Sequence, residues 1–151
     1  CKLADVDNDG IPNINDNCPN EAGEEIFNGC PKMPLSLSIF LKSYSDFFFD
    51  FDSFELNQDQ ISNISDLSKI LDRYDYIEVN IDGHASSEGE FEYNMQLSQS
   101  RSNSIKNTLI KNGVSDSRLK TRAYGESNPS YPNFPLSERK KNRRVRISVE
   151  N

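Results

Sequence analysis

The chain switches repeatedly between two periods of apolar residues, and this switching limits the folds open to it. Four segments alternate apolar and polar residues, as strands with one buried face do. They are residues 47–52, 77–81, 119–123 and 145–149. Two other segments, 57–74 and 93–111, repeat apolar residues every third or fourth position, as amphipathic helices do. This order predicts an α+β fold, a βαβαβ(α)β sandwich of one sheet with helices packed on it.

Local signals mark where the predicted helices begin and end. Asn57, followed three residues later by Gln60, predicts a capping box at the start of the first helix. Asn112-Gly113 predicts the end of the second helix. Ser137 predicts the cap of a short additional helix before the last strand. The first helix should bury one apolar stripe, formed by Ile61, Ile64, Leu67, Leu71 and Tyr74.

Residues 1–31 differ from the rest of the chain in charge. They carry seven acidic residues and one lysine, whereas the other 120 residues carry 17 acids and 16 bases and are nearly neutral. A short segment this acidic repels itself unless a cation neutralises it. Because it shows neither helical nor strand periodicity, we expect an irregular, ligand-held segment. Residues 32–36 should form a stiff linker, and residues 37–151 the folded domain.

Within the acidic segment, Asp5, Asp7 and Asp9 alternate with other residues and are followed by Gly10. This spacing matches the twelve-residue pattern of a calcium loop, in which glycine permits a sharp turn. The predicted ligands are the side chains of Asp5, Asp7, Asp9, Asn13 and Asp16 and the backbone carbonyl of Ile11. Asp16 stands where such loops usually have glutamate, which shortens the reach of the last ligand. The expected cofactor is calcium, and the alternative is an acidic, disordered spacer.

The three cysteines, Cys1, Cys18 and Cys30, all lie in this segment. Cysteine pairing in a small, loop-rich segment indicates an oxidising compartment and argues against the cytosol. Cys1 is interpreted as the tail of a missing upstream repeat or, alternatively, as the lipid-bearing first residue of a lipoprotein. The chain shows no initiator methionine or signal peptide, so we expect a removed signal or a fragment. No stretch has the roughly 18 apolar residues of a membrane helix.

One charged residue interrupts the apolar stripe of the second predicted helix. The stripe consists of Tyr93, Leu97, Ile105 and Leu109, and Arg101 lies in its middle. A guanidinium among core positions is costly unless it is paired, so we expect it to meet an anion. Two interpretations stay open: a structural partner inside the protein, or a ligand carboxylate, whose shape the planar guanidinium matches.

Five motifs follow one another in order over about residues 37–151. They are Phe49-Asp50-Phe51-Asp52-Ser53; Gly83-His84 with Gly89 and Tyr93-Asn94; Leu97-Ser98-Gln99-Ser100-Arg101; Tyr124-Gly125-Glu126-Ser127-Asn128-Pro129; and Asn142-Arg143-Arg144-Val145. Together they resemble the motifs of OmpA-like C-terminal domains. The resemblance implies noncovalent binding of the peptide stem of peptidoglycan, with no catalysis. Such binding would tether the outer membrane to the cell wall from its periplasmic side.

The resemblance also implies which residues bind the stem. In that family the helix arginine and the aspartate of a Gly-His-Thr-Asp loop hold diaminopimelate, and the arginine carries over to Arg101. The aspartate does not carry over, because Ser86 stands in its place, and Glu88 is the alternative acceptor. The implied peptidoglycan-binding residues are Arg101, Ser86, His84, Ala85, Asn94 and Arg144. If Ser86 marks a loss of wall binding, the domain would instead serve as a scaffold in an envelope complex.

Residues 1–31 resemble the thrombospondin type 3 repeats that precede many OmpA-like domains. The resemblance rests on the aspartate pattern and on the ending Asn28-Gly29-Cys30-Pro31. It implies a disulfide between Cys18 and Cys30, which leaves Cys1 over from a truncated repeat.

Two features allow other interpretations. His84 is the only histidine, and it has neither a nucleophile arrangement nor a second histidine to share a metal. We therefore expect a structural histidine at the corner between strand and loop. In the basic run near the C-terminus, strand alternation places Arg144 and Arg146 opposite Val145 and Ile147, which predicts a solvated sheet face. With a net charge of −7 and no interleaved aromatic residues, nucleic-acid binding is not expected.

Overall fold

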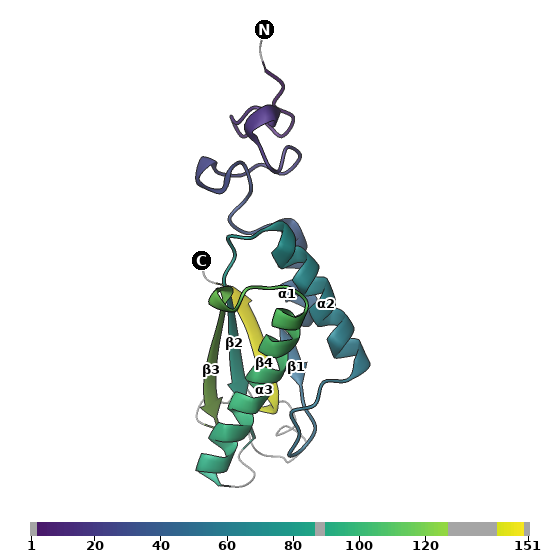
Figure 1. Cartoon of the computed structure of the whole chain (residues 1–151), viewed down its shortest axis with the longest axis vertical. Coiled ribbons are helices and arrows are strands. Elements are labelled where there is room, and N and C mark those ends of the chain that lie inside the picture. Colours follow the sequence, from purple (N-terminus) through teal and green to yellow (C-terminus); the bar gives the residue numbers. More distant parts are fainter. Residues whose placement is uncertain (1–2, 87–89, 127–141, 150–151) are drawn as a thin grey trace.

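The computed structural model describes residues 3–86, 90–126 and 142–149. Glu88 and the helix predicted after Ser137 lie outside these residues. The helices are α1 (Leu35–Tyr44), α2 (Gln58–Arg73) and α3 (Phe91–Lys111), with short 3-10 turns at Asn13–Asn15, Glu25–Phe27 and Asp116–Arg118. The strands are β1 (Asp46–Phe48), β2 (Val79–His84), β3 (Leu119–Gly125) and β4 (Arg144–Val149). Helices pack against a single sheet, which confirms the predicted α+β class (Figure 1).

The four strands lie in the order β1-β4-β2-β3. β4 is antiparallel to both of its neighbours, whereas β2 and β3 are parallel and are connected through α3. Two bidentate ion pairs link facing positions across the sheet. Arg146 Nε lies 2.7 Å from Asp46 Oδ1 between β4 and β1, and Arg122 Nε lies 2.7 Å from Asp82 Oδ1 between β3 and β2. These pairs fix the register of the strands and so the position of the last residues of β2 at the end of the sheet.

The core lies between the sheet and its helices. The fully buried side chains include Leu37, Ile64, Leu67, Leu71, Val79, Ile81, Ile105, Leu109 and Val145. The capping box is confirmed: Asn57 Oδ1 accepts from Gln60 N at 2.9 Å, and Gln60 Oε1 accepts from Asn57 N at 3.0 Å. Ile61 was wrongly placed in the buried stripe of α2, because it lies in the first turn at the solvent edge and is 38% exposed.

The first strand is shorter than predicted, and one helix was missed. β1 ends at Phe48, and Phe51 is 65% exposed because the chain turns there, with Asp52 at a φ of +54°. α1 begins at Leu35, inside the segment expected to be linker. In this helix Leu35, Leu37, Ile39 and Leu41 occupy every second position, and most of the positions between them are polar. This spacing has the period of a strand, so the sequence pattern did not indicate a helix.

The connector, residues 3–34, lies at one end of the domain (Figure 1). It is irregular apart from two 3-10 turns, and it contains the Cys18–Cys30 disulfide that the resemblance implied. Its contacts with the domain include the ring of Phe27, which stacks on that of Tyr76 with centroids 4.5 Å apart. No helix among the described residues combines the length and apolarity needed to cross a membrane.

Candidate functional site

A cavity of about 170 Å³ opens at the end of the sheet where β2 stops and α3 begins. This end lies away from the connector (Figure 1). Its walls come from the turn after β1, the end of β2, the first half of α3 and the residue before β4. The lining residues are Phe51, Asp52, Ala85, Ser86, Tyr93, Asn94, Leu97, Arg101 and Arg143.

Small residues let α3 approach β2 closely beside this cavity. A Cβ atom on Gly83 would lie 2.0 Å from the carbonyl oxygen of Ser98, so no larger residue fits there. Ser98 is fully buried, and its hydroxyl accepts a hydrogen bond of 3.0 Å from Gly125 N. Gly125 has a φ of +56°, a conformation that glycine adopts without a Cβ penalty. These contacts explain the Gly-His and Leu-Ser motifs as packing devices that place the next turn of α3, with Arg101, beside the end of β2.

Arg101 is fully buried, and three backbone carbonyls hold its guanidinium. Nε donates to Ser53 O at 2.8 Å, Nη1 to His84 O at 3.1 Å and Nη2 to Asp50 O at 3.1 Å. The guanidinium also lies 5.5 Å from the centre of the Phe49 ring. Arg101 therefore has structural partners inside the protein, which was one of the two interpretations of its position. These partners are neutral carbonyl dipoles, so they do not neutralise the positive charge of the guanidinium.

Within the described residues, no carboxylate forms an ion pair with Arg101. An arginine has five N–H donors, so these three bonds leave one N–H each on Nη1 and Nη2. Burial, and next the positive charge of Arg143, lower the pKa of Arg101 to about 10, and Asp52 partly opposes this shift. The group stays protonated at neutral pH, and two of its N–H donors have no partner among the described residues.

Five lining residues were not predicted as ligand contacts, and three of them, Asp52, Tyr93 and Arg143, are polar or charged. Asp52 is exposed at the cavity, and Tyr93 donates its hydroxyl hydrogen bond to Asp52 Oδ1. Tyr93 is 49% exposed, so its assignment to the buried stripe of the helix was wrong. Arg143 is 8% exposed and donates from Nε to Phe49 O at 3.2 Å. All three occur in the five motifs, but periodicity alone could not show which residues the loops bring to the cavity.

Four of the six residues implied by the resemblance line the cavity: Ala85, Ser86, Asn94 and Arg101. Ala85 and Ser86 are nearly fully buried just beyond β2. Asn94 donates from Nδ2 to Glu126 Oε2 at 3.3 Å, which links α3 to the end of β3. Ser86 thus lies in the wall of the cavity.

The other two, His84 and Arg144, do not line the cavity. His84 is buried, its ring stacks on Tyr124 with centroids 5.1 Å apart, and its backbone carbonyl holds Arg101. Burial and the nearby charge of Arg144 lower the pKa of His84 to about 4, so the imidazole is neutral. The predicted solvated face is wrong for Arg144, which is 2% exposed because it lies at the start of the inner strand β4, near His84.

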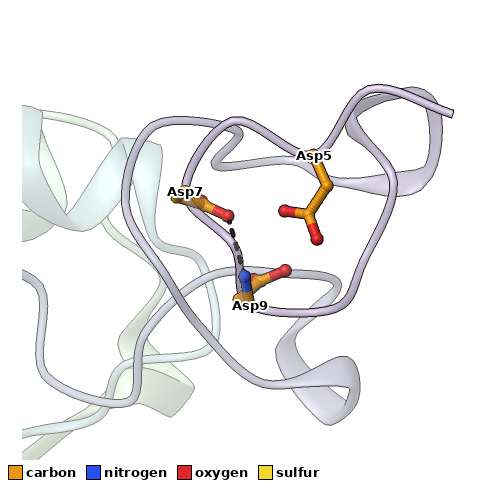
Figure 2. Close-up of side chains that lie close together, drawn as sticks. All are labelled: Asp5, Asp7 and Asp9. Carbon is orange, nitrogen blue, oxygen red and sulfur yellow. Dashed lines mark hydrogen bonds between the residues drawn. The ribbon is translucent and has the colours of Figure 1, made fainter. Parts of the chain in front are cut away.

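A second candidate site lies in the connector. One carboxylate oxygen from each of Asp5, Asp7 and Asp9 lies within 4.8 Å of the others, and the three carboxylates converge on one space (Figure 2). Among the described residues no lysine or arginine forms an ion pair with them. Asp7 Oδ2 and Asp16 Oδ2 are buried without a hydrogen-bond partner. Burial, and next the neighbouring carboxylates, raise the pKa of Asp7. Gly10 has the predicted turn conformation, at a φ of +93°.

Asn13 and Asp16, the other predicted side-chain ligands, belong to the same loop. Asn13 Oδ1 accepts from Val6 N at 3.0 Å, and Asp16 Oδ1 accepts from Cys18 N at 2.7 Å. Three converging carboxylates, of which Asp7 keeps a buried oxygen without a hydrogen-bond partner, fit a hard divalent cation, which takes oxygen ligands.

Fold and cavity together define the class of protein: a small α+β module with a cavity beside a buried arginine, Arg101, that forms no ion pair within the described residues. The chain belongs to the OmpA family, whose model matches residues 48–143. A model of the thrombospondin type 3 repeat matches residues 1–25.

Curated relatives and solved structures agree with this assignment. Outer membrane porin F of Pseudomonas aeruginosa is 32% identical over 97% of this chain and 42% of its own length. The peptidoglycan-associated lipoprotein of Brucella melitensis is 33% identical over 75% of this chain and 68% of its own length. The crystal structure of the C-terminal domain of Helicobacter pylori MotB is 30% identical, covers 70% of this chain and 84% of that one, and has a TM-score of 0.65. The chain spans 31 to 60% of the length of the first three curated relatives.

Proposed function

We propose that the domain binds the peptide stem of peptidoglycan noncovalently, without catalysis, and so tethers the outer membrane to the cell wall. Family membership supports this proposal, and relatives include proteins named for their association with peptidoglycan. The observation that supports it most directly is Arg101, a buried guanidinium beside the cavity with two N–H donors that have no partner among the described residues. A ligand carboxylate would complete its pairing, and diaminopimelate of the stem provides one.

The shape of the chain suits a tether on the periplasmic side of the outer membrane. The connector lies at one end of the domain, and the end of the sheet where β2 stops and α3 begins lies at the other (Figure 1). The cavity is lined by residues of this second end. A chain anchored upstream of the connector would therefore present the cavity away from its anchor, toward the wall. The disulfide agrees with an oxidising compartment of this kind.

We also propose that the connector binds calcium. Asp5, Asp7, Asp9, Asn13 and Asp16 would provide side-chain oxygens, and Ile11 its carbonyl. Support comes from the convergence of three carboxylates and from the buried, unpaired oxygens of Asp7 and Asp16. Bound calcium would supply the positive charge that this acidic loop lacks.

Sedimentation with purified, insoluble peptidoglycan tests the tether. The protein should pellet with intact walls, and free meso-diaminopimelate should release it. Chitin, an insoluble glycan of N-acetylglucosamine that carries no peptide stems, is the control and should not retain it. If the protein stays in the supernatant with intact walls, or pellets equally with chitin, stem binding is contradicted. The first result would favour the envelope scaffold, for which the serine at position 86 is the motivating feature.

A further inference from the structure

The cavity holds a negatively charged group besides its two buried arginines, Arg101 and Arg143. Among the described lining residues, Asp52 is the one carboxylate, and it is exposed, whereas Arg101 is fully buried. We propose that Asp52 accepts the ammonium group of a bound zwitterionic amino-acid end group, while Arg101 takes its carboxylate. This proposal rests on the proposed stem binding and names the group that recognises the ligand's amine.

One turn carries Asp52 and also holds the guanidinium. Residues 50–53 form a turn closed by Ser53 N donating to Asp50 O at 3.2 Å. The carbonyls of these same two residues accept from Arg101 Nη2 and Nε. Asp52 lies between them in sequence, so its backbone is tied to the guanidinium on both sides. This turn therefore holds the backbone of Asp52 beside the guanidinium before any ligand arrives.

The Asp52 carboxylate is oriented without being neutralised. The hydroxyl of Tyr93 donates to Oδ1, and within the described residues no arginine or lysine forms an ion pair with Asp52. A hydroxyl leaves the full negative charge on the carboxylate, so it remains available to an ammonium group. The hydrogen bond and the negative charge of Asp52 raise the pKa of Tyr93, which keeps this hydroxyl protonated.

The side chain of Asp52 is exposed at the edge of the cavity. Its φ of +54° lies in the left-handed region, which glycine adopts without a Cβ penalty and which aspartate tolerates better than most other residues. Glycine would therefore also suit this turn, but it would not provide a carboxylate at the cavity.

The two charges predict the orientation and the class of ligand. A carboxylate enters toward Arg101, and an ammonium on the adjacent carbon stays at the cavity mouth beside Asp52. The site should therefore favour an end group that carries both charges over a simple carboxylate. Ser86 contributes a neutral hydroxyl to the same wall and does not replace this carboxylate.

Calorimetry with two ligands tests the assignment. Meso-diaminopimelate carries both groups at each end, and pimelate is the same seven-carbon diacid without the amines. The parent protein should bind diaminopimelate more tightly than pimelate. Asp52→Asn should weaken diaminopimelate binding about tenfold, because a charge-assisted bond becomes a neutral one, and should not weaken pimelate binding. Asp66→Asn, the same change at an exposed position of α2 outside the cavity, should alter neither.

The outcomes distinguish the assignment of Asp52 from the proposed stem binding on which it rests. If Asp52→Asn binds diaminopimelate as the parent does, or loses both ligands equally, Asp52 is not the ammonium acceptor, although stem binding still stands. If the parent binds neither ligand, stem binding itself fails and this assignment fails with it. Asp52→Gly provides an independent check, since it should raise the melting temperature while weakening diaminopimelate binding. A lowered melting temperature would show that the side chain serves folding and would overturn the assignment.

Discussion

Glu21 of the connector accepts a hydrogen bond of 2.8 Å from the hydroxyl of Tyr74, the residue that ends α2. The other carboxylate oxygen of Glu21 accepts from Leu35 N, the first residue of α1, also at 2.8 Å. One acidic side chain therefore ties the disulfide loop to two helices of the domain. The connector is thus fixed at the end of the domain away from the cavity, where a tether would transmit force.

Removing the Glu21–Tyr74 hydrogen bond should destabilise the protein. Because Tyr74 is 3% exposed and the acceptor is charged, a double-mutant cycle with Glu21→Ala and Tyr74→Phe should give a coupling energy of about 1–2 kcal/mol. Urea unfolding of the parent, the single variants and the double variant measures it. Glu25→Gln, at an exposed position of the same loop, should show no coupling with Tyr74→Phe. A coupling energy near zero would mean that the contact does not hold the connector.

Calcium should protect the connector from proteolysis. Without a cation the Asp5, Asp7 and Asp9 carboxylates repel one another, so a chelator should speed cleavage within residues 5–16, and added calcium should slow it. Asp7→Asn combined with Asp9→Asn should remove the calcium effect, whereas Asp66→Asn should keep it. Mass spectrometry of the fragments gives the cleavage sites. Equal cleavage with calcium and with chelator would contradict the site.

The folded protein should titrate its only histidine near pH 4. Burial and then the charges of Arg144 and Arg146 lower the pKa of His84 from 6.5 to about 4, with Asp82 and Asp46 opposing. Unfolding then takes up a proton between these pH values. The free energy of unfolding should therefore fall by about 3 kcal/mol as pH drops from 6.5 to 4, and this contribution should be constant above that window.

The single imidazole Hε1 resonance in a proton NMR titration reports this pKa directly. His84→Gln should flatten the loss of stability between pH 6.5 and 4 relative to the parent. A midpoint near 6.5 in the folded protein would show that the ring is solvated and would contradict the buried, stacked position.

Restoring a carboxylate at position 86 should strengthen ligand binding. Ser86 lines the cavity, and its hydroxyl would give a ligand amine a neutral hydrogen bond of about 0.5–1.5 kcal/mol, against roughly 1.5–3 kcal/mol for a charged acceptor. Ser86→Asp should therefore bind free meso-diaminopimelate about tenfold more tightly in calorimetry. Binding of pimelate, which lacks ammonium groups, should not improve. Unchanged or weaker diaminopimelate affinity would show that residue 86 does not face the ligand amine.

Sequence patterns predicted the parts of the fold that depend on local chemistry. The capping box at Asn57, the end of α3 at Asn112 and the strands β2, β3 and β4 follow from nearest-neighbour spacing, which the chain alone contains. α1 was missed because its apolar residues alternate. The burial of Arg144 was missed because alternation shows that a strand has two faces but does not show which other elements cover each face.

The candidate site was only partly predictable for the same reason. Arg101 stood out because a charge interrupted an apolar stripe, and the structure buries it as that position requires. Asp52 and Arg143 reach the cavity from a turn and from a loop, where no periodicity indicates direction. Nor could the pattern show that backbone carbonyls would hold Arg101, because every residue has one and tertiary structure selects which of them accept.

Calorimetry of meso-diaminopimelate binding to Arg101→Gln, with Arg118→Gln as control, tests the central claim most directly. Arg118 is also held by three backbone carbonyls, those of Ile77, Leu71 and Tyr74, but lies outside the cavity. Both variants leave carbonyls unpaired and should lose about 2–4 kcal/mol of unfolding free energy. The account predicts that folded Arg118→Gln binds diaminopimelate as the parent does and that folded Arg101→Gln does not bind it measurably. Equal binding by folded Arg101→Gln and the parent would contradict the account.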